Sequence, residues 1–255
     1  MNRNLKLLFW LGMFAVSLES AAAREFNGVY EGHNMDHVAF PVGGIGTGMI
    51  CFEGTGAISH VSLHHVPDLF HEPCTFAAVC VKGVENGAKV LEANVPEYKK
   101  YGRLNGGMGV GGTTWGLPRF DEGRFSARFP IARLDLHDDD LPLDVSIVAW
   151  NPFIPNDEDN SGLPVGGFEY TFRNTSKKPV EAVFSFNTRN FMYKTDAAVS
   201  SVTPFERGFV LNQEAPANER HLEGHLAIWT DDARTTVDHC WVRSPDDGLE
   251  QRDAG

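Results

Sequence analysis

The chain has 255 residues, of which 42 % are hydrophobic, so it can bury the core of one large domain or two small ones. Its formal net charge is −12 at pH 7. A surface this acidic repels DNA, RNA and anionic lipid, which argues against those partners and leaves neutral ones such as sugars.

The N-terminus has the pattern of a secretory signal peptide. Arg3 and Lys6 precede a short apolar stretch at residues 7–16, and a run of three alanines then offers a cleavage site. The apolar stretch is too short to span a bilayer comfortably. We therefore expect removal of residues 1–23 and export of residues 24–255 to the periplasm or the extracellular space. The alternative is an uncleaved N-terminal anchor.

A glycine-rich stretch, PVGGIGTGMICFEGTGAI, occupies residues 41–58. Gly44, Gly46 and Gly48 give G-x-G-x-G rather than the dinucleotide-binding G-x-G-x-x-G, and an apolar strand follows them instead of a helix. No Lys-Ser or Lys-Thr pair follows, so a P-loop is also excluded. We expect the glycines to serve tight turns, with residues 53–56 closing a hairpin.

Most of the remaining chain reads as strands. Residues 143–149, 168–172 and 180–186 alternate apolar and polar side chains, and the polar connection at 174–179 between the last two predicts a hairpin. The alternation at 125–136 changes phase, which predicts a β-bulge. We expect further strands at residues 49–52, 57–63, 76–81, 208–211, 225–230 and 235–242, a glycine-rich surface loop at 104–116, and acidic loops at 137–142 and 156–164.

No stretch of twelve or more residues after the N-terminal segment has a clear helical period. Many short strands separated by turns are typical of a sandwich or a barrel. We therefore predict an all-β fold, an antiparallel β-sandwich over residues 24–255.

The cysteines and histidines predict neither a fold stabilised by disulfide bonds nor a metal site. Sequence cannot choose among the three full pairings of four cysteines; strand geometry disfavours a bond between Cys74 and Cys80, and we expect buried thiols. Among the histidines, His60 and His64 are too far apart along one strand to share a zinc ion. Convergence of His65, His71 and Cys74 stays open, but loop histidines are favoured, and we expect no metal and no cofactor. The cysteines are Cys51, Cys74, Cys80 and Cys240.

Carboxylates clustered in the two acidic loops are the only candidates for glycosidase-like chemistry. Retaining glycosidases need two carboxyl groups about 5–5.5 Å apart, one of them with a raised pKa. Loop acids are normally solvated, and those of residues 156–161 are expected to bond the loop backbone. We therefore predict no catalytic residue; the acids considered are Asp138, Asp139, Asp140, Asp157, Glu158 and Asp159.

Tryptophans are candidate platforms for a sugar ring, with anchoring in the core or a loop as the alternative. Trp150 ends the strand at 143–149 on its polar face and is flanked by Pro152 and Pro155. Trp150 and Trp115 are candidate contacts to a sugar or to another domain, and Trp229 and Trp241 are further candidate platforms.

Three stretches resemble glycoside hydrolase family 116, which includes non-lysosomal glucosylceramidase and bacterial β-glucosidases. They are FPVGGIGTGMI at residues 40–50, RFPIARLDL at 128–136, and AWNPFIPNDEDNSGLPVGGFEYTFRNTS at 149–176. The resemblance is spread over residues 40–190, and its most specific part is 150–164.

The resemblance implies the N-terminal β-sandwich of a two-part enzyme whose catalytic residues belong to a following (α/α)6 barrel. No residue here matches the catalytic motifs, and the chain stops before such a barrel, so we expect a fragment or a truncated relic. The expected function is a non-catalytic domain of an enzyme that hydrolyses β-glucosides or glucosylceramide, with that barrel as its partner. The alternatives are a carbohydrate-binding module and a purely structural domain with an exposed apolar patch.

Overall fold

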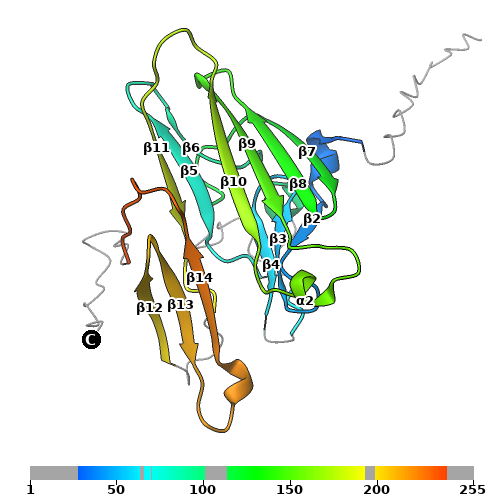
Figure 1. Cartoon of the computed structure of the whole chain (residues 1–255). Coiled ribbons are helices and arrows are strands. Elements are labelled where there is room, and N and C mark those ends of the chain that lie inside the picture. Colours follow the sequence, from blue (N-terminus) through cyan, green and yellow to red (C-terminus); the bar gives the residue numbers. More distant parts are fainter. Residues whose placement is uncertain (1–27, 64–65, 70, 101–113, 193–198, 240–255) are drawn as a thin grey trace, which may run out of the picture.

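The computed structural model describes residues 28–239 except 64–65, 70, 101–113 and 193–198, and it is built almost entirely of β-strands (Figure 1). The helical elements in this part are short: η1 (Gly32–Met35), α1 (Glu97–Lys100), α2 (Glu158–Ser161) and η3 (Arg220–Leu222). The predicted all-β fold is confirmed. Its strands are β1 (Tyr30–Glu31), β2 (Ala39–Val42), β3 (Met49–Glu53), β4 (Ile58–Ser62), β5 (Phe76–Val81), β6 (Ala88–Val90), β7 (Glu122–Arg128), β8 (Ile131–His137), β9 (Leu143–Trp150), β10 (Gly167–Asn174), β11 (Ala182–Asn187), β12 (Val199–Phe205), β13 (Gly208–Glu214) and β14 (Gly224–Trp229).

The strands form one large and three small sheets, and the paired neighbours within these sheets run antiparallel. The large sheet has the order β1-β7-β8-β9-β10. The small sheets have the orders β2-β3-β4, β11-β5-β6 and β12-β13-β14. Because most neighbours are consecutive in sequence, short turns make most of the connections.

The core lies between the five-stranded sheet and the sheets that contain β3 and β5. In β9 the alternation that predicted the strand separates buried residues from half-buried ones, starting with buried Leu143. The ring of Phe52 on β3 lies 5.7 Å from Phe125 on β7 and 5.5 Å from Phe168 on β10. This packing of two layers supports the predicted sandwich architecture.

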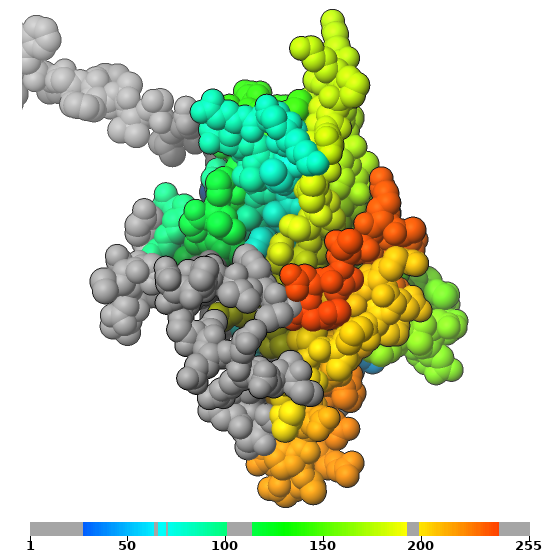
Figure 2. All heavy atoms as spheres, turned by 90° about the vertical axis from the view of Figure 1, so that its left-hand side faces the viewer, coloured from blue at the N-terminus to red at the C-terminus, as the bar shows by residue number. Residues whose placement is uncertain are grey.

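The sheet β12-β13-β14 has a small core of its own. Buried Leu211 of β13 joins Phe191, Met192 and Val61 of β4 in one apolar cluster. In Figure 2 these C-terminal strands form the lower part of the molecule, below the strands of the main core. The cluster therefore attaches this sheet to the β2-β3-β4 layer.

The predicted β-bulge in residues 125–136 is wrong, because two strands occupy this segment. β7 and β8 pair in continuous register from Glu122 opposite His137 to Arg128 opposite Ile131. The two-residue turn between them, Phe129-Pro130, accounts for the change of phase. A turn and a bulge shift the alternation equally, so the pattern alone does not separate them.

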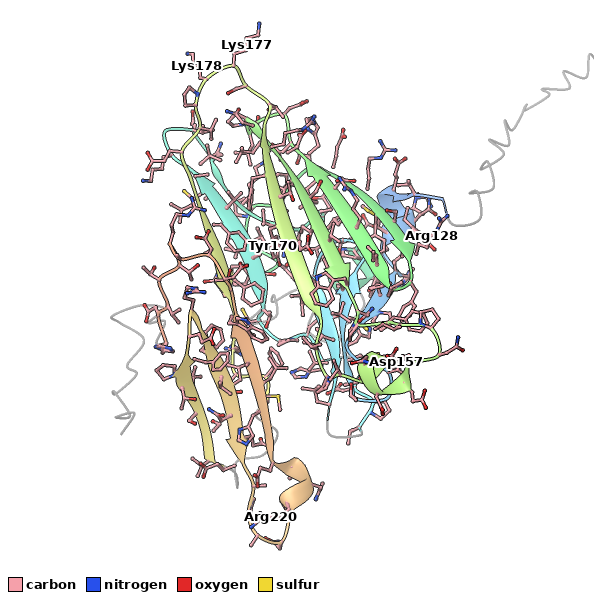
Figure 3. The ribbon with its side chains drawn as sticks, in the orientation of Figure 1. Arg128, Asp157, Tyr170, Lys177, Lys178 and Arg220 are labelled. Carbon is pink, nitrogen blue, oxygen red and sulfur yellow. The ribbon has the colours of Figure 1, made fainter. Side chains whose placement is uncertain are left out.

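The predicted hairpin at residues 174–179 is also wrong. β10 pairs with β9, whereas β11 pairs with β5, so the connection crosses from one layer to the other. The crossing places Phe184 of β11 against Tyr170 of β10, with ring centroids 4.9 Å apart. The connection projects at the top of the molecule in Figure 3, where Lys177 is labelled, and also at the top of Figure 2.

The other strand predictions have mixed outcomes. Residues 49–52, 57–63, 76–81, 208–211 and 225–230 do contain strands, and Gly56 closes the predicted hairpin by donating to the Glu53 carbonyl at 2.9 Å. The strand predicted at 235–242 is wrong for residues 235–239, which are not in a strand, and the rest of it lies outside the described residues. The signal peptide, the loop at 104–113, His64, His65, Cys240 and Trp241 also lie outside them. Within the described residues, no helix has the length and apolarity to cross a membrane.

Candidate functional site

Asn151 joins the two most distinctive stretches of the sequence. Its Oδ1 accepts a hydrogen bond from the Gly43 backbone at 2.6 Å, and its Nδ2 donates to the Pro41 carbonyl at 2.9 Å. Its backbone N–H donates to the Pro130 carbonyl at 3.0 Å. One buried amide thus fixes the glycine loop, the β7–β8 turn and the end of β9 together.

Ser161 does the same at the far end of this segment. Its carbonyl accepts from the Ile45 backbone at 2.9 Å, and its hydroxyl accepts from the Ile154 backbone at 2.9 Å. Asp157 caps the helix α2 by accepting from the Asn160 backbone at 3.0 Å, as expected for residues of this loop. The helix therefore anchors the tip of the glycine loop.

These bonds support an apolar surface, which we call the motif surface. Phe129 and Phe153 pack edge to face on it, with centroids 5.0 Å apart. The acidic residues Glu158 and Asp159 of α2 lie exposed beside it. Its members are large and exposed: Ile45, Phe129, Phe153, Ile154 and Leu163.

Neither tryptophan that we predicted as a contact lies fully open. Trp150 is half-buried beside the motif surface, and its ring covers Gly167 so closely that a Cβ there would stand 2.2 Å from it. Trp115 is half-buried over a small cavity, and its carbonyl accepts from Arg119 at 3.2 Å. Their contact to a sugar or another domain stays a prediction. Trp229 is exposed and packs against Phe205.

A buried cluster of charges is the second candidate site, and sequence reasoning missed it. Lys99 of α1 donates to Glu53 of β3 at 2.6 Å and also bonds Glu72. Arg119 donates to Oε2 of Glu92 from two nitrogens, at 3.1 and 3.2 Å. These five residues are far apart in sequence, so no local motif indicates the cluster.

The cavity inside this cluster is too small for a sugar. Its volume is ≈ 30 Å³, enough to hold a water molecule, whereas small-molecule sites measure about 300–1,000 Å³. Burial raises the pKa of Glu92, against the opposing pull of Arg119. Burial alone would lower the pKa of Lys99, but Glu53 and Glu72 raise it. Lys99 and Arg119 thus neutralise the carboxylates that they bond, although Oε1 of Glu53 and Oε2 of Glu72 are buried without a hydrogen-bond partner among the described residues.

The carboxylates of the two acidic loops lie in different environments. Our prediction that the loop acids are solvated is wrong for Asp138, which is 1 % exposed, bonds Lys89 and accepts from the Asp140 backbone at 3.0 Å. Asp139 is fully solvated. Hydrogen bonds from Asn160 lower the pKa of Asp157, the opposite of what a general acid needs.

Neither a metal site nor a disulfide bond is found among the described residues. No group of three or more His, Cys, Asp or Glu side chains in the described part of the chain could hold a metal ion. Cys51, Cys74 and Cys80 are free thiols, as expected for Cys74 and Cys80; however, only Cys51 is buried, whereas Cys80 is exposed.

A larger open groove lies where η1, α1 and the start of β7 meet. Its volume is ≈ 910 Å³, and polar side chains such as Asp36, Asn94 and Lys100 line it. This volume lies in the range of small-molecule sites. Sequence reasoning gave no sign of it, because its walls come from segments separated by many residues.

A model of the N-terminal domain of family 116 glycosyl hydrolases, described as beta-glucosidase 2, matches residues 39–250. The chain belongs to glycoside hydrolase family 116. The match begins at the first residue of β2 and includes the whole motif surface and the charge cluster. A comparison with curated proteins gave no match. The family 116 resemblance seen in the sequence is thus confirmed, and the matched region corresponds to that family's N-terminal domain.

Proposed function

We propose that this domain is the non-catalytic N-terminal part of an exported glycosidase and that it docks onto the (α/α)6 catalytic domain through the motif surface. The observation that carries the proposal is the convergence of the two family-like stretches at Asn151, beneath exposed apolar side chains. Exposed apolar surfaces are typical of contacts with other proteins, which supports docking here. The pairing of the buried carboxylates Glu53 and Glu92 with Lys99 and Arg119 supports the non-catalytic role.

The proposed reaction of the full enzyme is the retaining hydrolysis of β-glucosides, with glucosylceramide as one candidate substrate. The family membership supports this reaction class. The N-terminal domain would brace the barrel and wall part of the substrate cleft.

The test is co-expression of this chain with the catalytic domain of a family 116 enzyme, followed by size exclusion. We expect a stable complex that the double substitution Phe153→Asp/Ile154→Asp abolishes. Val183→Asp on β11 is the matched control, since this residue is exposed to a similar extent away from the motif surface. A complex that survives the double substitution would place the interface elsewhere.

A second candidate function is a carbohydrate-binding module, favoured by the groove beside α1. Calorimetric titration with gluco-oligosaccharides tests it. Saturable binding that Asn94→Ala weakens would support this function, and no heat of binding would exclude it for those sugars.

A further inference from the structure

Three apolar side chains of the motif surface are exposed although their backbones are firmly held. Ile45, Ile154 and Leu163 are 57 %, 51 % and 48 % exposed. Ser161, itself 1 % exposed, bonds the backbones of Ile45 and Ile154. The Leu163 carbonyl lies so close to Gly44 that a Cβ there would stand 2.2 Å away. The surface is therefore pre-organised before any partner arrives.

Ile45 is the best placed of the three to act as an anchor. It lies at the tip of the glycine loop, next to Gly46, whose surroundings are open within 4 Å of where a Cβ would stand. A large apolar side chain on a fixed backbone loses little conformational freedom on binding, which is what a binding hot spot needs.

The exposed charges on the two sides of this anchor have opposite signs. Glu158 and Asp159 are exposed on α2, whose last residue Ser161 bonds Ile45. On the other side of the surface Arg128 is exposed next to Phe129 (Figure 3, where Asp157 and Arg128 are labelled). The α2 side therefore presents an acidic edge to whatever covers Ile45, and the chain as a whole is acidic.

We infer, resting on the docking function proposed above, that Ile45 inserts into an apolar pocket of the catalytic domain and that lysine or arginine side chains border this pocket opposite α2. Charge complementarity then fixes the orientation of the two domains and speeds their association. The apolar pocket supplies the affinity, and the basic border supplies the selectivity.

The experiment measures binding of the full chain to a separately produced family 116 catalytic domain by calorimetry, at about 50 mM and about 500 mM salt, because salt screens exposed charges. We expect Ile45→Asp to weaken binding about tenfold or more at both salt concentrations. The control is Val199→Asp on β12, which is also exposed and lies away from α2.

The charge arm uses the double substitution Glu158→Lys/Asp159→Lys, with Glu85→Lys/Glu214→Lys as the control that changes the net charge equally at other exposed sites. We expect the α2 variant to bind more weakly than the control at low salt and to lose most of the salt dependence. If the two charge variants behave alike and Ile45→Asp binds normally, the inference is wrong while docking stands. If the unaltered chain does not bind at either salt concentration, the docking function and the inference are both overturned.

Discussion

The Gly43 backbone N–H donates a hydrogen bond to Oδ1 of Asn151 at 2.6 Å, across 108 positions of the sequence. This contact brings together the two stretches that most resemble family 116, and it lies directly beneath the motif surface. The glycine loop is thus held by Asn151 beneath the motif surface, which we propose as an interaction surface.

Replacing Asn151 by alanine removes this support. The change leaves the Gly43 N–H and the Pro41 carbonyl without their side-chain partner at a partly buried site, so we expect the free energy of unfolding to fall by about 1–2 kcal/mol. Urea unfolding followed by circular dichroism measures it. Asn94→Ala is the control, because Asn94 is exposed and donates only a long bond of 3.4 Å to the Asp121 carbonyl. Equal costs for the two variants would contradict the role of Asn151.

Alanine substitutions at two glycines with positive φ distinguish the stability cost of backbone strain from that of a packing clash. Gly46 has φ +77° with open space around it, whereas Gly56 has φ +99° and a Cβ there would stand 2.8 Å from Leu134 Cδ2. We expect Gly46→Ala to cost about 1–2 kcal/mol from backbone strain alone and Gly56→Ala to cost clearly more. Urea unfolding of both variants measures the two losses of unfolding free energy. A larger loss for Gly46→Ala than for Gly56→Ala would contradict the packing cost expected at Gly56.

Lys99 should be essential for the buried charge cluster. Lys99→Met leaves Glu53 and Glu72 as buried charges without their cation, which costs about 3–5 kcal/mol near neutral pH. Adding Glu53→Gln should recover part of that loss. Because the folded-state pKa of Lys99 lies above 10.5, its contribution is complete below pH 10.5 and is lost as the pH rises through the folded pKa. The difference in unfolding free energy between the unaltered chain and Lys99→Met should therefore persist from neutral pH up to pH 10.5 and shrink in stronger alkali.

The thiols should differ sharply in reactivity. Burial raises the pKa of Cys51 to about 11, with a smaller contribution from Glu53, so we expect no reaction with a chromogenic disulfide in the folded state. Cys80 is exposed and should react rapidly. A chain carrying Cys74→Ser and Cys240→Ser isolates these two thiols. Two equally fast thiols in that chain would contradict the burial of Cys51.

The sequence predicts where the strands lie better than it predicts which strands pair with each other. The alternation that starts at Leu143 predicts β9 because one face of the strand is buried. The same kind of alternation in β10 and β11 cannot show that the connection containing Pro179 changes layers, because a hairpin and a crossing need the same polar residues.

The candidate site was predictable only in part. Trp150 and the glycine loop indicate the region, but Asn151 and Ser161 look like ordinary loop residues in the sequence. Their importance comes from burial and from bonds to distant segments, which no local pattern encodes. The cluster around Lys99 was missed for the same reason.

Turnover of a fluorogenic β-glucoside by purified residues 24–255 tests the central claim most directly. The account predicts no hydrolysis above the buffer rate, because the buried carboxylates Glu53 and Glu92 are paired with Lys99 and Arg119 and the family's chemistry is proposed to lie in the catalytic domain. Hydrolysis that is lost on substituting Glu92 or a loop acid such as Asp157 would contradict it.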